Sequence, residues 1–459
     1  MMNLQNKRAL VVGLGKSGIA AARFLREHGA VVIACDAKEE KPEMAALRED
    51  GIEVQAGAAQ WDGLEQQELI VISPGVPVQT AELGRARGLG IPVIGEMELA
   101  SRFLAGKMLA ITGANGKTTT TTLVRKILED AGLHTQVGGN IGTPVLDLLA
   151  GSTAATWNVL EVSSFQLETT VEFHPKIAVI LNITPDHLDR HGSFEQYVRE
   201  KEKIFARQGA DDYLVLNADD KTTQMCAGRA QAQVFWFSGA RPQVKRGTFV
   251  HQNVIVFVPL EGAAMEPVLA VEEIPLKGAH NVENVLAAVC AARLAGVSAE
   301  SIRESVKSFQ AVEHRLQYVA TVNGVEYYND SKATNVDATM KAIASFGGGI
   351  HLILGGKDKN SDYTLLAPLL RERVKVVYTI GSAAEKITGE LTGVVKIVQA
   401  ETLENAVRMI EQNAQPGEIG LLAPACASFD QFDSYGHRGR VFVELVKKIG
   451  NREQGSGNR

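Results

Sequence analysis

The sequence has little of what marks secreted, zinc-binding or nucleic-acid-binding proteins. Its four cysteines are scattered without a CxxC pair, which argues against a disulfide framework and a zinc site and fits a reducing compartment. Lys and Arg total 47 against 53 Asp and Glu, and no long basic run occurs. Because sequence-independent binding to DNA or RNA needs clustered positive charge, a nucleic-acid partner is disfavoured.

Membrane features are also absent from the sequence. No apolar run approaches the roughly 18 residues that would cross a bilayer. The first residues, MMNLQNKRALVVGLG, pass directly into an apolar strand and a glycine turn, without a basic-then-apolar leader and a cleavage site. We therefore expect a cytoplasmic protein with no membrane partner, and we expect it to be a monomer.

The chain does contain a regular alternation of short apolar strands and helices. At 459 residues it is too long for one compact core, so two or three domains are expected. Strands separated by helices predict parallel sheets with crossover connections. We predict an α/β protein of three domains: a Rossmann-like N-terminal domain (1–96), a central P-loop-type ATPase domain with a parallel sheet (97–310) and a Rossmann-like C-terminal domain (311–459).

The first glycine turn reads Gly13-Leu14-Gly15-Lys16-Ser17-Gly18, and Asp36 ends the next strand 18 residues later. The turn follows a strand and opens a helix, which is the context of a dinucleotide-binding fingerprint. Glycines let the backbone approach a phosphate ester, and the helix N-terminus offers free N–H groups. The motif therefore indicates a ligand that carries a phosphate group, and it indicates NAD in particular less securely. A tight turn without ligand, or an NAD-dependent oxidoreductase, stays open at this point.

The second turn, GANGKTTT, follows the strand 108–112 and opens a helix. Lys117 supplies an ammonium for the β- and γ-phosphates of ATP, and Thr118 supplies a hydroxyl for Mg²⁺. The spacing is G-x-x-G-K-T from Gly113, with Ile111 where a P-loop has its outer glycine, so this is a shorter variant. A lysine without a ligand would stand against the positive end of the helix, which makes a ligand-free turn improbable.

Polar residues follow two further strands of the central segment. Glu161 ends an apolar strand, where its carboxylate is placed to hold Mg²⁺ directly or through water, or to cap the next helix. The segment NITPDHLDRH, with His187, packs two Asp and two His after another strand. By itself it could equally border a metallohydrolase site. Lys201 lies on the predicted helix 194–207, where a solvated lysine is the ordinary interpretation.

Three strand-following loops of the third segment, 328–335, 355–359 and 424–432, are rich in lysine, hydroxyl and amide groups. Such groups at the carboxyl ends of parallel strands suit a small dianionic substrate. Asn281 and Asn284 lie one turn apart at a helix start, where amides could read a nucleobase or cap the helix.

These motifs together resemble the Mur ligase family, in particular its D-glutamate-adding branch. The resemblance runs through GLGKSG, SPGVP, GANGKTT, GGNIG, EVSSFQLE, LNITPDHLDRH, HNVEN, EHR, NDSKATN, LGGKDKN and PACASFDQF, so it covers nearly the whole chain. The short G-x-x-G-K-T loop is the form found in this family. The NDSKATN loop is the segment that distinguishes D-glutamate-adding members from relatives that add other groups.

The resemblance implies a role for each matching residue. The UDP-sugar would be bound by Gly15, Lys16, Ser17, Asp36, Ser73, Gly75 and Asn140. ATP would lie on Gly113, Ala114, Asn115, Gly116, Lys117, Thr118 and Thr119, with Asn281, Asn284, Arg315 and Asp330. Mg²⁺ would be held by Thr118, Glu161, His187 and Lys201, the last as a carbamate. D-glutamate would be bound by Lys332, Thr334, Lys359, Ser428 and Tyr435; the sequence around Tyr435 departs from the family pattern. Lys117, His187 and Lys201 would form the catalytic group.

The implied reaction joins D-glutamate to UDP-N-acetylmuramoyl-L-alanine in peptidoglycan precursor synthesis, with ATP and Mg²⁺ as cofactors. The substrate carboxylate would become an acyl phosphate, and the amine of D-glutamate would then attack it. Three alternatives remain: a sister ligase with another amino acid, an NAD-dependent oxidoreductase, and a nucleotide-binding regulator.

Overall fold

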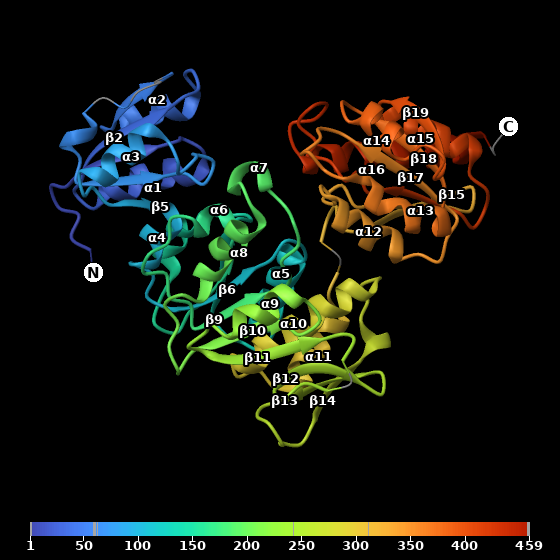
Figure 1. Cartoon of the computed structure of the whole chain (residues 1–459), viewed down its shortest axis with the longest axis horizontal. Coiled ribbons are helices and arrows are strands. Elements are labelled where there is room, and N and C mark those ends of the chain that lie inside the picture. Colours follow the sequence, from blue (N-terminus) through green and yellow to red (C-terminus); the bar gives the residue numbers. More distant parts are fainter. Residues whose placement is uncertain (1, 58–60, 62, 242, 311, 457–459) are drawn as a thin grey trace. The chain divides into compact units, whose positions relative to one another are not determined.

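The computed structural model describes residues 2–456 except 58–60, 62, 242 and 311, and it describes side chains as far as residue 450 (Figure 1). The chain folds into two compact units. Unit 1 comprises Met1–Glu273 and Glu283–Lys307, and unit 2 comprises Ile274–Val282 and Ser308–Arg459. The domain boundaries at 96/97 and 310/311 stay predictions, and Ala311 lies outside the described residues.

The first part of unit 1 is a five-stranded parallel sheet in the order β3-β2-β1-β4-β5. This order places the loops after β1 and β4 at the centre of the sheet, where ligands of open α/β sheets bind. The strands are β1 (Arg8–Val12), β2 (Val31–Asp36), β3 (Glu53–Ala56), β4 (Leu69–Ile72) and β5 (Val93–Gly95), and the helices are α1 (Lys16–Glu27), α2 (Pro42–Glu49), α3 (Ala81–Gly88) and α4 (Glu96–Ser101).

The second part of unit 1 is a nine-stranded sheet in the order β14-β13-β12-β11-β10-β9-β6-β8-β7. Its pairings are parallel from β7 to β12 and antiparallel between β12, β13 and β14. The parallel strands are β6 (Lys107–Thr112), β7 (Thr135–Gly139), β8 (Trp157–Glu161), β9 (Ile177–Ile180), β10 (Tyr213–Asn217), β11 (Gln233–Ser238) and β12 (Gly247–His251); β13 (Val254–Val258) and β14 (Glu266–Ala270) complete the edge.

Helices connect the strands of this sheet or follow its last strand, β14. The longer ones are α5 (Lys117–Asp130), α8 (Phe194–Glu202), α9 (Lys221–Ala227), α10 (Ala279–Leu294) and α11 (Ala299–Lys307), and short ones are α6 (Ser164–Leu167), α7 (Leu188–His191) and the 3₁₀ segment η2 (Val145–Gly151). The predicted helix 194–207 ends earlier as an α-helix and continues as a 3₁₀ turn at Lys203–Phe205.

Unit 2 holds a six-stranded sheet in the order β15-β16-β20-β17-β18-β19, parallel except for the β15–β16 hairpin. The strands are β15 (Gln317–Val322), β16 (Val325–Asn329), β17 (Ile350–Gly355), β18 (Val374–Ile380), β19 (Lys396–Glu401) and β20 (Ile419–Leu422). Its helices are α12 (Val336–Ala344), α13 (Ala367–Arg373), α14 (Ala384–Glu390), α15 (Leu403–Asn413) and α16 (Tyr435–Ser456). The predicted three-part α/β architecture is confirmed.

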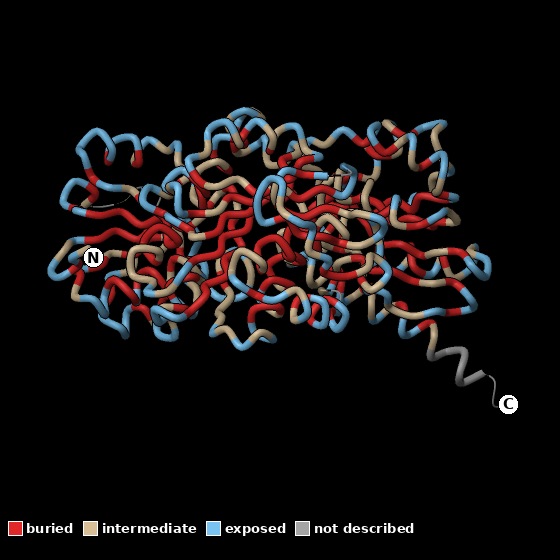
Figure 2. The backbone as a smooth tube through the Cα atoms, turned by 90° about the horizontal axis from the view of Figure 1, so that it is seen from below, coloured by how far each residue is buried: buried red, intermediate tan, exposed pale blue. Residues whose placement is uncertain are grey.

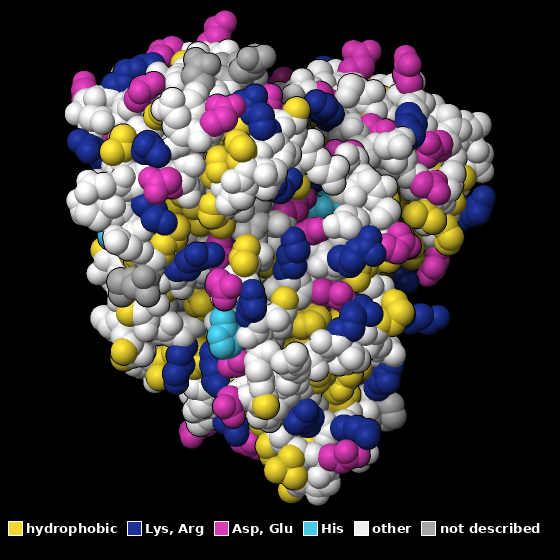
Figure 3. All heavy atoms as spheres, turned by 60° about the vertical axis from the view of Figure 1, so that its left-hand side comes forward, with side chains coloured by type: hydrophobic (Ala, Val, Ile, Leu, Met, Phe, Trp, Pro, Cys, Tyr) yellow, Lys and Arg dark blue, Asp and Glu magenta, His cyan; other side chains and the backbone are white. Residues whose placement is uncertain are grey.

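Buried residues follow the strands, while exposed residues are concentrated in the helices and connecting loops on the outside (Figure 2). Separate clusters of buried side chains cover the two faces of the unit 2 sheet. On the face drawn in Figure 3, Lys and Arg alternate with Asp and Glu. Within the part of the chain that the structure describes, no helix has the length and apolarity to cross a membrane.

Candidate functional site

A cavity of about 620 Å³ lies at the carboxyl edge of the first sheet. It is bounded by the glycine turn after β1, the end of β2 and the turn 73–77 after β4, together with Trp61. A cavity of this size accommodates a nucleotide-sized ligand. Six residues predicted for the UDP-sugar lie in its lining: Gly15, Lys16, Ser17, Asp36, Ser73 and Gly75.

Hydrogen bonds hold the walls of this nucleotide cavity together. Asp36 Oδ2 accepts from Leu14 N at 2.6 Å, and Ser73 Oγ donates to Gly13 O at 2.6 Å. A Cβ at Gly18 would lie 1.8 Å from Gly13 O, so the helix approaches the turn as closely as only glycine allows. The first turn of α1 therefore lines the cavity, as the start of a helix does in phosphate-binding sites.

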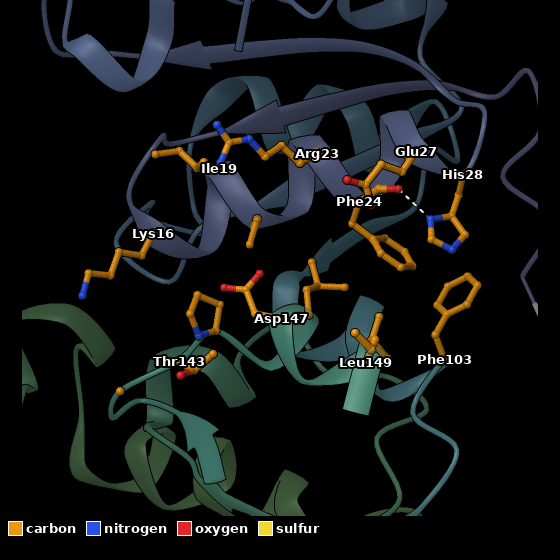
Figure 4. Close-up of a pocket in the computed structure, with 15 residues that line it drawn as sticks. Lys16, Ile19, Arg23, Phe24, Glu27, His28, Phe103, Thr143, Asp147 and Leu149 are labelled. Carbon is orange, nitrogen blue, oxygen red and sulfur yellow. Dashed lines mark hydrogen bonds between the residues drawn. The ribbon is translucent and has the colours of Figure 1, made fainter. Parts of the chain in front are cut away.

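A second cavity, of about 850 Å³, extends from Lys16 along α1 (Figure 4). Its far end is formed by Phe24, His28 and Phe103, whose rings contact one another. Asp147 of η2 faces α1 near the middle of this cavity. Lys16 lines both cavities.

Residues predicted to bind substrates and Mg²⁺ lie at or just after the ends of four strands of the central sheet, all at the same edge. The register pairs Ile111 of β6 with Glu161 of β8, Glu161 with Gly139 of β7, and Thr112 with Ile180 of β9. Because these strands are parallel, the ATP loop, Glu161, Asn140 and the segment after β9 all begin at the same edge. The sheet thus brings together residues that are more than 70 positions apart in sequence, such as Gly113 and His187.

The ATP loop is shaped by two glycines and one asparagine. Gly113 and Gly116 have φ of +159° and +86°, and a Cβ at Gly116 would lie 2.2 Å from Asn284 Oδ1. Asn182 clamps the loop: its Oδ1 accepts from Asn115 N at 2.9 Å, and its Nδ2 donates to Asn115 O at 3.1 Å. The loop backbone is therefore fixed before the start of α5, as a phosphate-binding loop requires.

Two lysines meet at the carbonyl of Gly113. Lys117 Nζ donates to Gly113 O at 2.8 Å and to Ala114 O at 3.0 Å. Lys201 Nζ donates to Gly113 O at 3.0 Å and to Thr112 Oγ1 at 3.3 Å, and it lies 4.8 Å from the ring centre of Tyr197. The solvated-lysine interpretation is wrong for Lys201, whose side chain is buried. Burial, and secondarily the charge of Lys117, lower the pKa of Lys201 well below its usual range.

Glu161 offers one carboxylate oxygen to the interior. Its Oε1 accepts from Asn140 Nδ2 at 2.7 Å, whereas its buried Oε2 has no hydrogen-bond partner. A polar oxygen left without a partner in the interior is costly, and a divalent cation would satisfy it. Asn140, expected beside the UDP-sugar, lies against this carboxylate. Among the described residues, no group of three or more His, Cys, Asp and Glu that could hold a metal occurs.

His187 lies in a strained loop after β9. It has φ of +53°, a left-handed conformation that costs a non-glycine residue about 1–2 kcal/mol. Its ring meets Phe165 edge-on at 4.9 Å, and its Nε2 lies 3.7 Å from Asp186 Oδ2. Strain of this kind persists only where the surrounding structure fixes the residue.

The two amides at the start of α10 lie in different units. In unit 1, Asn284 Oδ1 accepts from Thr120 Oγ1 at 3.5 Å beneath the ATP loop. In unit 2, Asn281 Nδ2 donates to Lys277 O at 2.7 Å. Asn284 is thus a direct neighbour of the phosphate loop.

The three polar loops of unit 2 follow neighbouring strands, β16, β20 and β17. The buried guanidinium of Arg438 joins two of them, donating to Ser331 Oγ at 2.9 Å, Ser331 O at 2.9 Å and Cys426 O at 3.1 Å. Lys357 and Ala427 exchange backbone hydrogen bonds and join the third. The loops therefore form one connected surface.

The residues predicted for D-glutamate all lie on these loops or at the start of α16. Ser428 is buried, and Lys332 Nζ lies 3.7 Å from the ring centre of Tyr435. Asp330, predicted for ATP, follows β16, and its partly enclosed carboxyl has a pKa raised to about 7 by desolvation, against the attraction of Arg315. Cations and hydroxyls thus gather at one edge of the unit 2 sheet.

Sequence reasoning missed several structural residues of the site. Asn182 and Arg438 are the clearest, since each fixes a loop by hydrogen bonds to backbone groups. Their positions after a strand and on a predicted helix were visible in the sequence, but their burial and partners were not. Trp61 in the nucleotide cavity gave no motif signal.

Comparison with known proteins identifies the family of the chain. Three family descriptions match along the chain: "Mur ligase MurD-like, N-terminal domain" at residues 7–95, "Mur ligase middle domain" at 111–292 and "Mur ligase, glutamate ligase domain" at 314–426. The chain is 61% identical over 448 residues to the UDP-N-acetylmuramoylalanine–D-glutamate ligase of Acidobacterium capsulatum, covering 97% of each chain. The chain belongs to the Mur ligase family.

Other relatives agree with this assignment. The ligase of the same description from Koribacter versatilis is 56% identical, with 99% of this chain and 100% of the relative covered. Among solved structures, UDP-N-acetylmuramate-alanine ligase of Thermotoga maritima matches with a TM-score of 0.59 at 20% identity, covering 96% of this chain and all of the other. This last likeness concerns the fold. The family matches and the named relatives show an ATP-dependent amide-bond ligase, which excludes the oxidoreductase alternative.

Proposed function

We propose that the chain joins D-glutamate to the carboxyl group of UDP-N-acetylmuramoyl-L-alanine, with cleavage of ATP to ADP and phosphate. The observation that carries this proposal is the full-length similarity to curated ligases of that description. The proposal is also supported by three regions whose chemistry suits its three substrates: the nucleotide cavity, the ATP loop and the connected polar loops of unit 2.

The first step forms an acyl phosphate. An oxygen of the substrate carboxylate attacks the γ-phosphorus of ATP, and ADP leaves with the bridging oxygen. Lys117 occupies the mouth of the loop, where phosphate oxygens would compete with the carbonyls that it contacts. The amine of D-glutamate then attacks the acyl carbon, phosphate leaves, and the nitrogen loses a proton to give the amide.

Lys201 is proposed to act as a carbamate. A buried lysine with a lowered pKa presents a neutral amine, and its nitrogen adds to CO₂ with release of one proton. The product is a carboxylate at a position where the sequence has an amine. The lysine would then contribute negative charge at Thr112 and Gly113, instead of adding to the positive charge of Lys117.

Magnesium fits the residues at this edge of the sheet. The unpartnered Glu161 Oε2, the Thr118 hydroxyl, His187 and the proposed carbamate are the groups that would hold it. When bound, Mg²⁺ supplies positive charge to the phosphate oxygens. Asn140 positions the Glu161 carboxylate through its other oxygen.

The test is phosphate release by the purified chain with ATP, Mg²⁺ and UDP-N-acetylmuramoyl-L-alanine. We expect D-glutamate to support turnover, and L-glutamate, L-lysine and meso-diaminopimelate to support little. Mass spectrometry of the product should show the mass of the joined substrates. Turnover with L-lysine in place of D-glutamate would identify a sister ligase instead.

A further inference from the structure

We propose that Arg190 is a positioning residue that couples the turn 73–77 of the nucleotide cavity to the loop of His187. The inference rests on the proposed function, because it assigns that cavity to the UDP part of the substrate. Arg190 lies on α7, three residues after His187, and its side chain is 14% exposed.

The guanidinium of Arg190 faces the turn after β4. It donates from Nη2 to Val76 O at 2.7 Å and to Pro74 O at 3.4 Å, and from Nη1 to Gly75 O at 3.5 Å. One planar fork therefore meets three successive carbonyl groups, a geometry that lysine cannot reproduce. These contacts lie within unit 1.

The same turn is held from its other side by the glycine turn of β1. Ser73 Oγ donates to Gly13 O, and Val76 N donates to Ser73 O at 2.9 Å. The turn thus lies between the phosphate-binding backbone of the nucleotide cavity and Arg190. A change in the position of Arg190 would shift a wall of that cavity.

On the side of the central sheet, Arg190 is fixed by Glu168 and Phe165. Both carboxylate oxygens of Glu168 accept from it, at 2.7 and 3.3 Å, and its guanidinium lies 4.9 Å from the ring centre of Phe165. The His187 ring packs on this same phenyl ring. Phe165 is therefore a shared support for the arginine that holds the cavity and for the histidine expected at the metal.

Glu168 continues the connection to the buried lysine. Its Oε1 lies 3.2 Å from His191 Nδ1; the His191 ring contacts Tyr197, over which Lys201 lies. The contacts form an unbroken series from the turn 73–77 to two of the proposed catalytic groups. Binding of the UDP part in the nucleotide cavity would thereby fix the positions of the groups that surround the reacting carboxylate during phosphoryl transfer.

The kinetic test compares Arg190→Lys and Arg190→Met with the wild-type chain. Both variants lose the three carbonyl contacts, so we expect KM for UDP-N-acetylmuramoyl-L-alanine to rise roughly tenfold or more, with a fall in kcat. KM for D-glutamate should stay within about twofold. Arg207→Lys is the matched control, since Arg207 also bonds a carbonyl and a carboxylate, at Val171 and Glu172, on the exposed surface of the same unit. Unchanged KM for the UDP substrate in either folded Arg190 variant would overturn the inference.

A second experiment uses the wild-type chain and does not depend on the folding of a variant. UDP alone should slow amide hydrogen exchange in the peptide that contains residues 186–192, because it orders the turn that Arg190 holds. Protection of the glycine turn without any protection of that peptide would contradict the coupling. If wild type releases no phosphate with D-glutamate, the proposed function fails, while the exchange result still decides the coupling.

Discussion

At the residue scale, Gly116 is the position where the ATP loop tolerates least change. An alanine there would have to adopt a left-handed φ of +86°. Its Cβ would also lie only 2.2 Å from Asn284 Oδ1. We expect Gly116→Ala to displace the loop and to weaken ATP binding by tenfold or more, as a lost charge-assisted hydrogen bond to phosphate would. Binding of a fluorescent ATP analogue measures the effect.

Gly132 provides the control for this change. It has φ of +77°, yet nothing lies within 4 Å of a Cβ placed there. Gly132→Ala should therefore cost only the strain of the left-handed conformation, about 1–2 kcal/mol of stability, and leave ATP affinity unchanged. Equal ATP affinity in the Gly116→Ala chain would show that the loop does not need the glycine.

The residue types in the sequence predicted which chemical groups the site contains, but not which of them are buried or in contact. Lys117, Thr118 and Glu161 could be selected because phosphate and Mg²⁺ require ammonium, hydroxyl and carboxylate groups. The same reasoning assigned Lys201 to solvent, since its neighbours on the helix are charged and burial depends on contacts distant in sequence. Only the family resemblance singled it out. The roles assigned to these residues stay predictions.

At the element scale, helix α4 carries two buried glutamates with different surroundings. Glu98 accepts from the backbone N–H groups of residues 171–173 and pairs with Arg102 at 2.6 Å. Glu96 accepts from Leu146 N at 2.8 Å, while its Oε2 has no partner. Burial raises the pKa of Glu96 to about 7.

The raised pKa of Glu96 makes stability depend on pH. The folded chain holds a proton that the unfolded chain releases near pH 4.5, so this glutamate's contribution falls as pH rises from about 4.5 to 7. Glu96→Gln should be near neutral at pH 4.5 and stabilise by up to about 3 kcal/mol at pH 8. Urea denaturation at both pH values measures this, each time against wild type.

Glu98→Gln on the same helix should behave in the opposite way. It replaces an acceptor of several N–H groups by an amide that has one oxygen, so we expect a loss of about 1.5–3 kcal/mol at pH 8. Destabilisation of the Glu96→Gln chain at pH 8 would mean that its ionised carboxylate stabilises the fold.

Elements with clear apolar periods were predictable, and others were not. The sequence predicts strands over 8–12 and 374–380 and a helix over 403–413, and β1, β18 and α15 have these bounds. Helix α3 has no clear signal in the sequence, because Gly84 and Gly88 weaken a helix; it forms with Thr80 Oγ1 accepting from Leu83 N at its start. Strand β16 was missed because VEYYN is half polar, and its hairpin with β15 stabilises it.

At the scale of the whole molecule, the division into two units predicts two unfolding transitions. A ligand stabilises the unit that binds it and leaves the other unchanged, by about 2.7 kcal/mol at a concentration of 100 times Kd. UDP should therefore raise the midpoint of one calorimetric transition, because the nucleotide cavity lies wholly in unit 1. Leu352→Ala, in the core of unit 2, should lower the other transition and so identify it. A UDP-induced shift in the transition that Leu352→Ala lowers would place the nucleotide site elsewhere, and a single transition shifted by both changes would mean that the units unfold as one.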